Sequence, residues 1–246
     1  MDRLLPTLVA LVVLGGVTTA VLAVVGVPQR FGPVLAVLRA ALQLAAISFV
    51  LSGVITSPGW TALALAVMLG VASWTAARRL GGLRRWPLTA GTILGGAAAA
   101  LAVVFAVGAL EPSPRYLLAL GGITIGNAMA ITILTGRRFL EAADERWHEV
   151  EGWLALGATP SEATRTIARG AVRTALVPTV DQTRTTGLVT LPGAFVGAVF
   201  GGLSPLEAGR FQLLVLAAIL AAGAIAAVLA VRALAALEQR PSAATD

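Results

Sequence analysis

The sequence predicts an all-α, polytopic membrane protein with about seven transmembrane helices and a cytoplasmic helix–turn–helix (coupling) loop. Of its 246 residues, 57% are apolar and only 12% are charged, whereas soluble domains carry roughly 25% charged residues. Apolar segments of about 20 residues, the length that crosses a bilayer, recur along the chain. Between two of them, the segment 137–176 is polar and carries helix start and stop signals.

The seven spans are expected to begin near prolines, because the missing N–H of proline would have no partner in the first helical turn. Their predicted bounds are uncertain by about 2–4 residues. The spans cover residues 5–27, 34–56, 59–77, 88–110, 115–135, 179–201 and 206–236. The prolines at their starts are Pro6, Pro33, Pro58, Pro87, Pro114, Pro178 and Pro205. A six-span arrangement, with the 179–201 segment re-entrant, is the alternative.

The arginines predict the orientation of these spans. All 18 basic residues are arginine, and they gather in the segments 78–86 and 137–173, whereas the alternate loops are nearly free of net charge. Basic loops stay on the cytoplasmic side of the plasma (inner) membrane. The N-terminus is therefore expected outside and the C-terminus in the cytoplasm. This topology accounts for the net charge of +6 without a nucleic-acid partner.

Missing residue types exclude several kinds of chemistry. The chain has no cysteine, which excludes disulfides and cysteine-based metal or redox sites. It has no lysine, which excludes a P-loop and Schiff-base chemistry. We therefore expect no cofactor here, and an ATP-driven protein of this kind needs ATP and Mg²⁺ bound by a separate subunit. We expect a single transmembrane domain over 1–246 with a flexible tail at 238–246.

The segment 137–176 has the pattern of two helices joined by a turn. Apolar residues at three- and four-residue spacing predict an amphipathic helix along the membrane face; they are Phe139, Leu140, Ala143, Trp147, Val150 and Leu154. Gly157 is expected to end this helix. Thr159, Pro160 and Glu162 then supply an N-cap, a first helical residue and a capping-box acid for the next helix.

A basic stripe follows, because Arg165, Arg169 and Arg173 lie four residues apart on the second helix. Such a helix either rests its arginines on lipid phosphates or forms a coupling element docked in a groove of a motor protein. The glycine turn and the two capping signals favour the docked element.

The loop resembles the EAA-type loop of bacterial ABC-transporter permeases, which contacts the ATPase subunit. Glu151, Gly157 and Ile167 match that pattern, whereas Arg169-Gly170 stands where the pattern has Leu-Pro. A closer resemblance, to the FetB family of permeases linked to iron export, covers most of the chain. It rests on the segments LALGATPSEA (154–163), DQTRTTGLVTLPG (181–193) and SPLEA (204–208).

These resemblances imply a homodimeric permease in the lipid bilayer, worked by an ABC ATPase subunit. They imply that one set of loop residues couples the two subunits; it comprises Glu151, Gly157, Thr159, Pro160, Glu162, Arg165 and Ile167.

Polar residues inside the predicted spans are candidates for a translocation path, because such groups usually face a cavity or a partner. The densest cluster, 181–186, either lines a path or sits at the cytoplasmic interface, where Arg184 would snorkel. Pro192 is expected to kink its helix beside a cavity. The candidate path residues are Asp181, Thr183, Arg184, Pro192, Gly193, Arg39, Gln43 and Asn127. Arg39, Gln43 and Asn127 each have the alternative of a hydrogen bond to a neighbouring helix.

Gly193, Gly197 and Gly201 predict a face for close helix packing, either within one subunit or at a dimer seam. The acids around the single histidine, His148, have the simpler interpretation of a solvated helix face, since no second histidine completes an HExxH motif. No metal site is assigned.

We therefore expect a permease subunit rather than an enzyme, exporting iron, another metal or a small solute. A bare hard cation wants several oxygen ligands, and Asp181 is the only acid expected within a span, so a chelated form or a pair of Asp181 residues across a dimer is needed for iron. A motor-independent channel or assembly factor is the alternative. A membrane enzyme has less support, because paired carboxylates are missing from the spans.

Overall fold

The computed structural model describes residues 4–26, 28, 30–54 and 57–235, which form helices joined by short turns. Their contacts divide the chain into two compact units, with the division after Val54. This all-helical architecture confirms the predicted fold class.

The first unit is a pair of helices, α1 (Leu4–Val24) and α2 (Gly32–Val54). A Cβ added at Gly15 of α1 would lie 3.4 Å from Cγ2 of Val34, so the two helices touch there. The chain leaves α1 through Gly26, whose φ of +76° favours glycine. Most of the described side chains of this unit are exposed within it, as expected for a surface that lipid or protein must cover.

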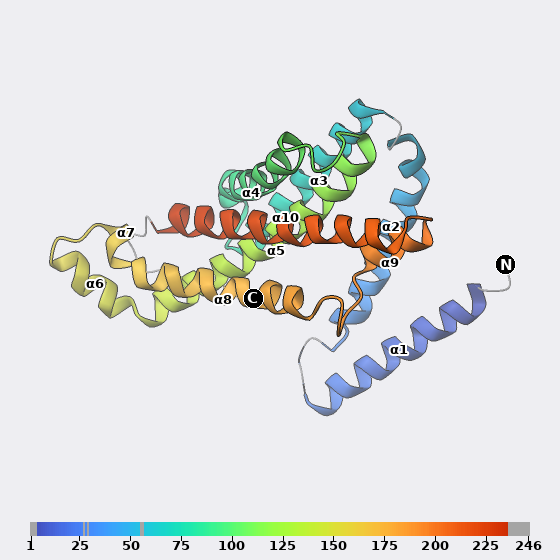
Figure 1. Ribbon diagram of the computed structural model, residues 1–246. Coiled ribbons are helices and arrows are strands. Elements are labelled where there is room, and N and C mark those ends of the chain that lie inside the picture. Colours follow the sequence, from blue (N-terminus) through green and yellow to red (C-terminus); the bar gives the residue numbers. More distant parts are fainter. Residues whose placement is uncertain (1–3, 27, 29, 55–56, 236–246) are drawn as a thin grey trace. The chain divides into compact units, whose positions relative to one another are not determined.

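The second unit is a bundle whose centre is α10, packed on α4 and α5 (Figure 1). The helix α3 packs on α4 and α5, and α8 packs on α5 and α10. The long helices are α3 (Pro58–Arg79), α4 (Trp86–Ala106), α5 (Pro114–Glu145), α8 (Arg165–Thr185) and α10 (Pro205–Leu234). The short ones are η1 (Leu83–Arg85), α6 (Trp147–Ala155), α7 (Pro160–Ala163) and α9 (Gly193–Phe200).

Small residues bring α4 and α10 together. A Cβ on Gly96 would clash with the carbonyl oxygen of Ala222 and lie 3.1 Å from Cβ of Ala226. Both alanines are fully buried. Close backbone contact of this kind is how membrane helices gain packing energy where the hydrophobic effect is weak.

Replacing Gly96 with alanine is therefore expected to destabilise the bundle by about 1–3 kcal/mol, the usual cost of overpacking. Thermal unfolding of the detergent-solubilised protein measures the change. Gly91, in the same helix, has no atom within 4 Å of its added Cβ, so Gly91→Ala is the matched control and should leave the melting temperature unchanged or slightly higher. Equal melting temperatures for the two variants would contradict the close α4–α10 contact.

Five of the described helices are long and apolar enough to cross a membrane, which confirms a polytopic protein. They are Leu5–Val24, Pro58–Arg79, Leu83–Ala106, Pro114–Glu145 and Pro205–Leu234, and the run Gly32–Ser48 is a shorter apolar helix. The first five predicted spans and the last one each correspond to a helix, and α3, α5 and α10 begin at the expected prolines.

The predicted span 179–201 is wrong as a single helix. The chain is helical to Thr185, non-helical through Pro192, and helical again only from Gly193 to Phe200. Gly187 has a φ of +93°, which ends the helix before Pro192 can kink it. Pro178 does not start a helix either, because it lies inside α8, which begins at Arg165.

The predicted amphipathic helix is also different from the observed one. Its first part is the continuation of α5, and the chain changes direction at Arg146 before α6 begins. Its apolar face does not lie on the membrane, since Phe139, Ala143 and Val150 are fully buried against α8 and α10. Periodicity marks an apolar face equally for lipid and for a protein core, so only the tertiary packing distinguishes them.

Candidate functional site

The predicted coupling loop lies beyond the membrane end of α5. This helix has 32 residues, or about 48 Å at 1.5 Å per residue, whereas the hydrocarbon core is about 30 Å thick. The surplus is at the charged end, where Arg138 and Glu141 form an exposed ion pair of 3.2 Å. The segment 146–164, which follows, is therefore outside the hydrocarbon core.

A glycine turn fixes the end of α6. The N–H of Gly157 donates to the carbonyl of Leu154 at 2.9 Å, and the N–H of Ala158 donates to the carbonyl of Trp153 at 3.0 Å. These two bonds form a Schellman motif. It requires a left-handed residue, and Gly157 has a φ of +87°. The predicted role of Gly157 as the helix terminator is confirmed.

A capping box begins the next helix, as the sequence predicted. The N–H of Thr159 donates to Oε2 of Glu162 at 2.8 Å, its hydroxyl donates to the same oxygen at 2.6 Å, and the N–H of Glu162 donates to the Thr159 hydroxyl oxygen at 3.4 Å. Pro160 is the first helical residue. Because the hydroxyl and N–H of Thr159 both bind the charged form, they lower the pKa of Glu162 below its usual range.

This lowered pKa predicts a pH dependence. A carboxylate with a depressed folded-state pKa stabilises the box above its unfolded pKa of about 4.3, and the stabilisation is lost as the pH falls through the lowered value. Hydrogen exchange of the loop amides should therefore accelerate between about pH 5 and pH 3 in the wild type, relative to Glu162→Gln at each pH. Parallel exchange profiles in the two proteins would show that the box does not depend on the carboxylate.

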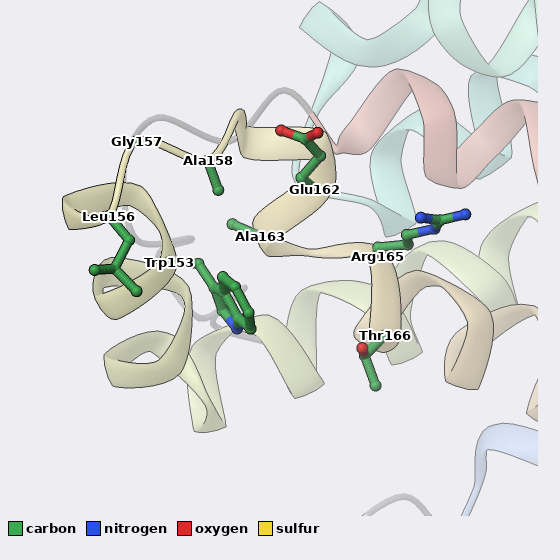
Figure 2. A pocket seen from close by; sticks show the side chains of 8 residues that line it. All are labelled: Trp153, Leu156, Gly157, Ala158, Glu162, Ala163, Arg165 and Thr166. Carbon is green, nitrogen blue, oxygen red and sulfur yellow. The ribbon is translucent and has the colours of Figure 1, made fainter.

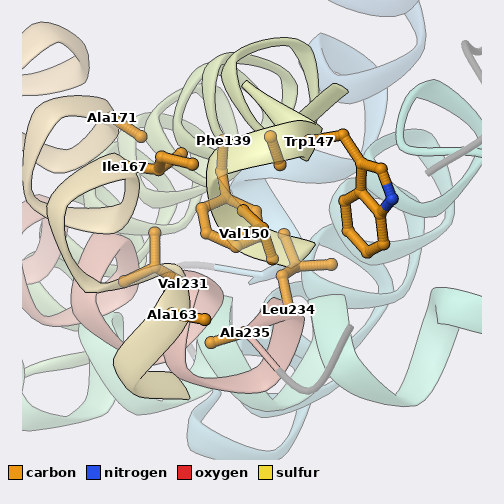
Figure 3. Packing of buried hydrophobic residues seen from close by; sticks show 10 residues of the cluster. Phe139, Trp147, Val150, Ala163, Ile167, Ala171, Val231, Leu234 and Ala235 are labelled. Carbon is orange, nitrogen blue, oxygen red and sulfur yellow. The ribbon is translucent and has the colours of Figure 1, made fainter. Parts of the chain in front are cut away.

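The loop is anchored to three long helices through one buried cluster (Figure 3). Val150 of α6 and Ala163 of α7 share it with Phe139 of α5, Ile167 of α8 and Val231 of α10. Ile167 is thus a core residue, 4% exposed, which positions the loop from beneath. A push on α6 and α7 would act on α5, α8 and α10 together.

Glu151 belongs to the same framework. Its Oε1 accepts a hydrogen bond of 2.7 Å from Nε1 of Trp147, whose side chain is buried in the cluster. Since a buried indole N–H needs an acceptor, Glu151 positions Trp147 while its own side chain is exposed.

The outer surface of the loop contains a hollow of 450 Å³ (Figure 2). It is lined by Trp153, Leu156, Gly157, Ala158, Glu162, Ala163, Arg165 and Thr166. The side chains of Ala158 and Ala163 point toward one another across it, and Arg165 extends from its far edge. Trp153 and Leu156 are 57% and 82% exposed. The arginines Arg165, Arg169 and Arg173 are all exposed, as the predicted basic stripe requires.

The second candidate site is the break between α8 and α9. Ala171 shares a buried cluster with Val231, and Ala175 shares another with Ala227, so α8 runs antiparallel to α10. Continued at the same rise per residue, this register places Asp181 at the level of about residue 221 of α10. That level is near the middle of α10, a candidate membrane span.

The polar side chains at the end of α8 bond mainly to their own helix. Thr183 donates to the carbonyl of Thr179 at 2.8 Å, and Thr186 donates to that of Gln182 at 2.8 Å. Asp181 and Arg184 form a loose, exposed pair of 3.5 Å, as their spacing predicted. The non-helical segment closes on itself through a 2.8 Å bond from the N–H of Gly187 to the carbonyl of Thr190.

Irregular backbone at membrane depth is tolerated only where protein or a water-filled cavity covers it. Within the second unit this segment is uncovered, since Leu188 is 95% exposed. Pro192 is the N-cap residue of α9, and Gly193 is its first residue. Asp181 and Arg184 before the break and Gly193 after it are exposed, and Pro192 is half-buried.

The glycine face of α9 is open within the described chain. A Cβ on Gly193 or Gly197 would meet no atom within 4 Å, and one on Gly201 would meet only the backbone of α9 itself. Packing inside the unit does not explain these glycines, and the dimer seam stays a prediction.

The remaining path candidates lie elsewhere. Arg39 and Gln43 are exposed on α2, in the first unit. Asn127 is half-buried on α5, and its Nδ2 donates to the carbonyl of Ile123 at 2.9 Å in the same helix. This bond lies within α5, so it gives no evidence of a contact with a neighbouring helix.

Next to His148, Oε1 of Glu149 accepts a hydrogen bond of 2.9 Å from Nε of Arg146. Among the residues that the structure describes, no three His, Cys, Asp or Glu side chains gather closely enough to hold a metal ion.

The family model described as "Uncharacterised protein family (UPF0014)" matches residues 5–237, nearly the whole chain. The chain belongs to this family. Among its curated relatives, this UPF0014 protein is 38% identical to "UPF0014 membrane protein STAR2" of Oryza sativa subsp. japonica, over 79% of this chain and 69% of the relative. It is 35% identical to "Protein ALUMINUM SENSITIVE 3" of Arabidopsis thaliana, over 77% and 71%. It is 31% identical to "Probable iron export permease protein FetB" of Escherichia coli K12, over 78% and 75%. No solved structure matches the chain.

Two residues of this UPF0014 protein escaped the sequence reasoning. Trp153 and Leu156 line the hollow, although neither belongs to the apolar face that the spacing predicts for their helix. The sequence contains a signal for them, because they are two large apolar residues in a capped, charged segment outside the predicted spans.

Proposed function

We propose that this UPF0014 protein is the membrane-spanning permease subunit of an ATP-driven ABC transporter. The observation that carries the proposal is the buried cluster that joins the capped loop to the ends of α5, α8 and α10. A partner that moves the loop would move three long helices at once. The name of the Escherichia coli relative, an iron export permease, supports the same function.

The energy source is a separate ATPase subunit that binds ATP and Mg²⁺. A nucleotide-binding loop of the Walker type needs a lysine, which this sequence lacks. The ATPase would act on the surface formed by Gly157, Thr159, Pro160, Glu162 and Arg165, with Glu151 and Ile167 positioning that surface from behind.

The permease works as a homodimer in the plasma (inner) membrane, with its N-terminus outside and its C-terminus in the cytoplasm. The path is lined at the break between α8 and α9, by Asp181, Thr183, Arg184, Pro192 and Gly193. Support comes from the depth of the break and from its uncovered charges, which lipid cannot solvate.

The cargo is iron, another metal or a small solute, carried outward. Two relatives carry names that refer to iron export and to aluminium sensitivity. Because the described carboxylates do not gather into a metal-ligand set, a chelated metal suits the path better than a bare hard cation.

Flux measurements in proteoliposomes test this function. The tagged chain is purified from its native membranes, co-purifying proteins are identified by mass spectrometry, and flux is measured with and without ATP. We expect a protein with ATP-binding motifs to co-purify. We also expect flux only when both proteins and ATP are present. Flux through the chain alone would favour the motor-independent channel instead.

A further inference from the structure

The hollow on the coupling loop is a preformed, partly apolar surface outside the hydrocarbon core. Its walls are held by the Schellman motif at Gly157 and by the capping box of Thr159 and Glu162. Beneath it, Ala163 belongs to the buried cluster that anchors the loop. Trp153 and Leu156 therefore stay exposed on a rigid frame, and exposed apolar surface of this kind marks an interaction site.

The charges around the hollow favour a protein over a lipid surface. Glu149, Glu151 and Glu162 are exposed on α6 and α7, and an anionic lipid surface repels carboxylates. On the same side of the hollow as Glu162, Arg165 extends outward and begins the exposed arginine stripe. A partner that fits must offer an apolar group to the walls and a negative group to Arg165.

We propose that the hollow receives one large apolar side chain from the ATPase subunit, beside a carboxylate of that subunit that pairs with Arg165. The volume of 450 Å³ leaves room for such a side chain between Trp153 and Ala163. This inference rests on the proposed function and adds the chemistry of its partner surface. We call the hollow in this role the socket, because it receives a side chain of the partner.

Site-specific photo-crosslinking tests the socket. A benzophenone amino acid replaces Leu156 in the full chain, which is expressed in its native membranes and irradiated. The crosslinked peptide is then identified by mass spectrometry. The expected product lies on a protein with ATP-binding motifs, in a segment that carries a large apolar residue next to an aspartate or glutamate. The same probe at Glu141, exposed on α5 outside the hollow, should give at least about tenfold less of that product.

Two substitutions then test the shape of the hollow. Ala158→Leu fills it and should lower the affinity for the ATPase by about tenfold or more. Ala155→Leu is the matched control, because Ala155 is the exposed last residue of α6, three positions before Ala158, and does not line the hollow. It should change the affinity less than about twofold.

A third substitution tests the charge. Arg165→Glu should weaken binding by about tenfold, and replacing the aspartate or glutamate of the crosslinked partner segment with lysine should restore it. Equal affinity of the Ala158→Leu and Ala155→Leu variants would overturn the socket, whatever the outcome for Arg165.

The results distinguish a failure of the docking proposal from a failure of the proposed permease function. If the ATPase co-purifies but the probe at position 156 gives only lipid adducts or a segment without acidic residues, the socket is wrong and the permease function stands. If no ATP-binding protein co-purifies or is crosslinked from any position on the loop, both are wrong.

Discussion

Replacing Gly157 with valine should abolish ATP-driven transport while leaving the protein inserted in the membrane. The φ of +87° costs a residue with a Cβ about 1–2 kcal/mol, and a β-branched residue more. The Schellman bonds would open, and α6 and α7 would lose their fixed angle. Gly157 itself is exposed, and a Cβ added there meets no atom within 4 Å. The melting temperature should therefore fall only by the amount that this backbone strain causes, whereas ATP-dependent flux should fall by about tenfold or more.

Gly152 provides the control for this substitution. It lies within α6, and a Cβ added there meets no atom within 4 Å. Gly152→Ala should therefore retain full transport and gain a few tenths of a kcal/mol of helix stability, up to about 1 kcal/mol. Flux that is unchanged in Gly157→Val would count against the coupling role of the loop, and loss of flux in both variants would point to a general sensitivity of α6.

Neutralising Asp181 should lower transport by about tenfold or more without lowering the stability of the fold. An ionised side chain at membrane depth lowers the stability of the fold. The ion pair of Asp181 and Arg184, with a separation of 3.5 Å, is exposed and loose, so it contributes little to stability. If Asp181 serves the path, Asp181→Asn should impair flux while the melting temperature stays equal or rises. Flux in proteoliposomes and thermal unfolding in detergent measure the two effects.

The pair Arg138–Glu141 is the matched control, since it has the same three-residue spacing but lies on the charged end of α5. Glu141→Gln should leave both flux and melting temperature unchanged. A melting temperature that falls in Asp181→Asn, with flux lost in proportion, would instead show that Asp181 serves the structure.

The sequence predicted the elements whose signals are local. Gly157, Thr159 and Glu162 were assigned correctly because a glycine terminator and a capping box are formed by residues within a few positions of one another. The starts of α3, α5 and α10 at prolines follow from the same kind of local chemistry.

The wrong predictions have two kinds of cause, one local and one that depends on distant contacts. The segment after Thr185 reads as the continuation of an apolar span, although Gly187, Thr190 and Pro192 all weaken a helix. By contrast, the apolar face around Phe139 and Val150 was wrongly expected on the membrane because of distant contacts: periodicity does not say whether lipid or α10 covers it. The hollow was missed since it depends on α6 and α7 folding back on each other.

Because α5 is long and unbroken, a small tilt of this helix moves its ends by a large distance. One end of the helix follows the Ser113 cap and the other leads into the loop, and the rod between them is about 48 Å long. A tilt of only about 5° therefore displaces one end relative to the other by about 4 Å. A displacement of that size is comparable to the diameter of a small ion with part of its hydration shell. Slight rocking at the loop end of α5 would then suffice to shift its opposite end, and distance labels at the two ends would register these movements as shifts in opposite directions.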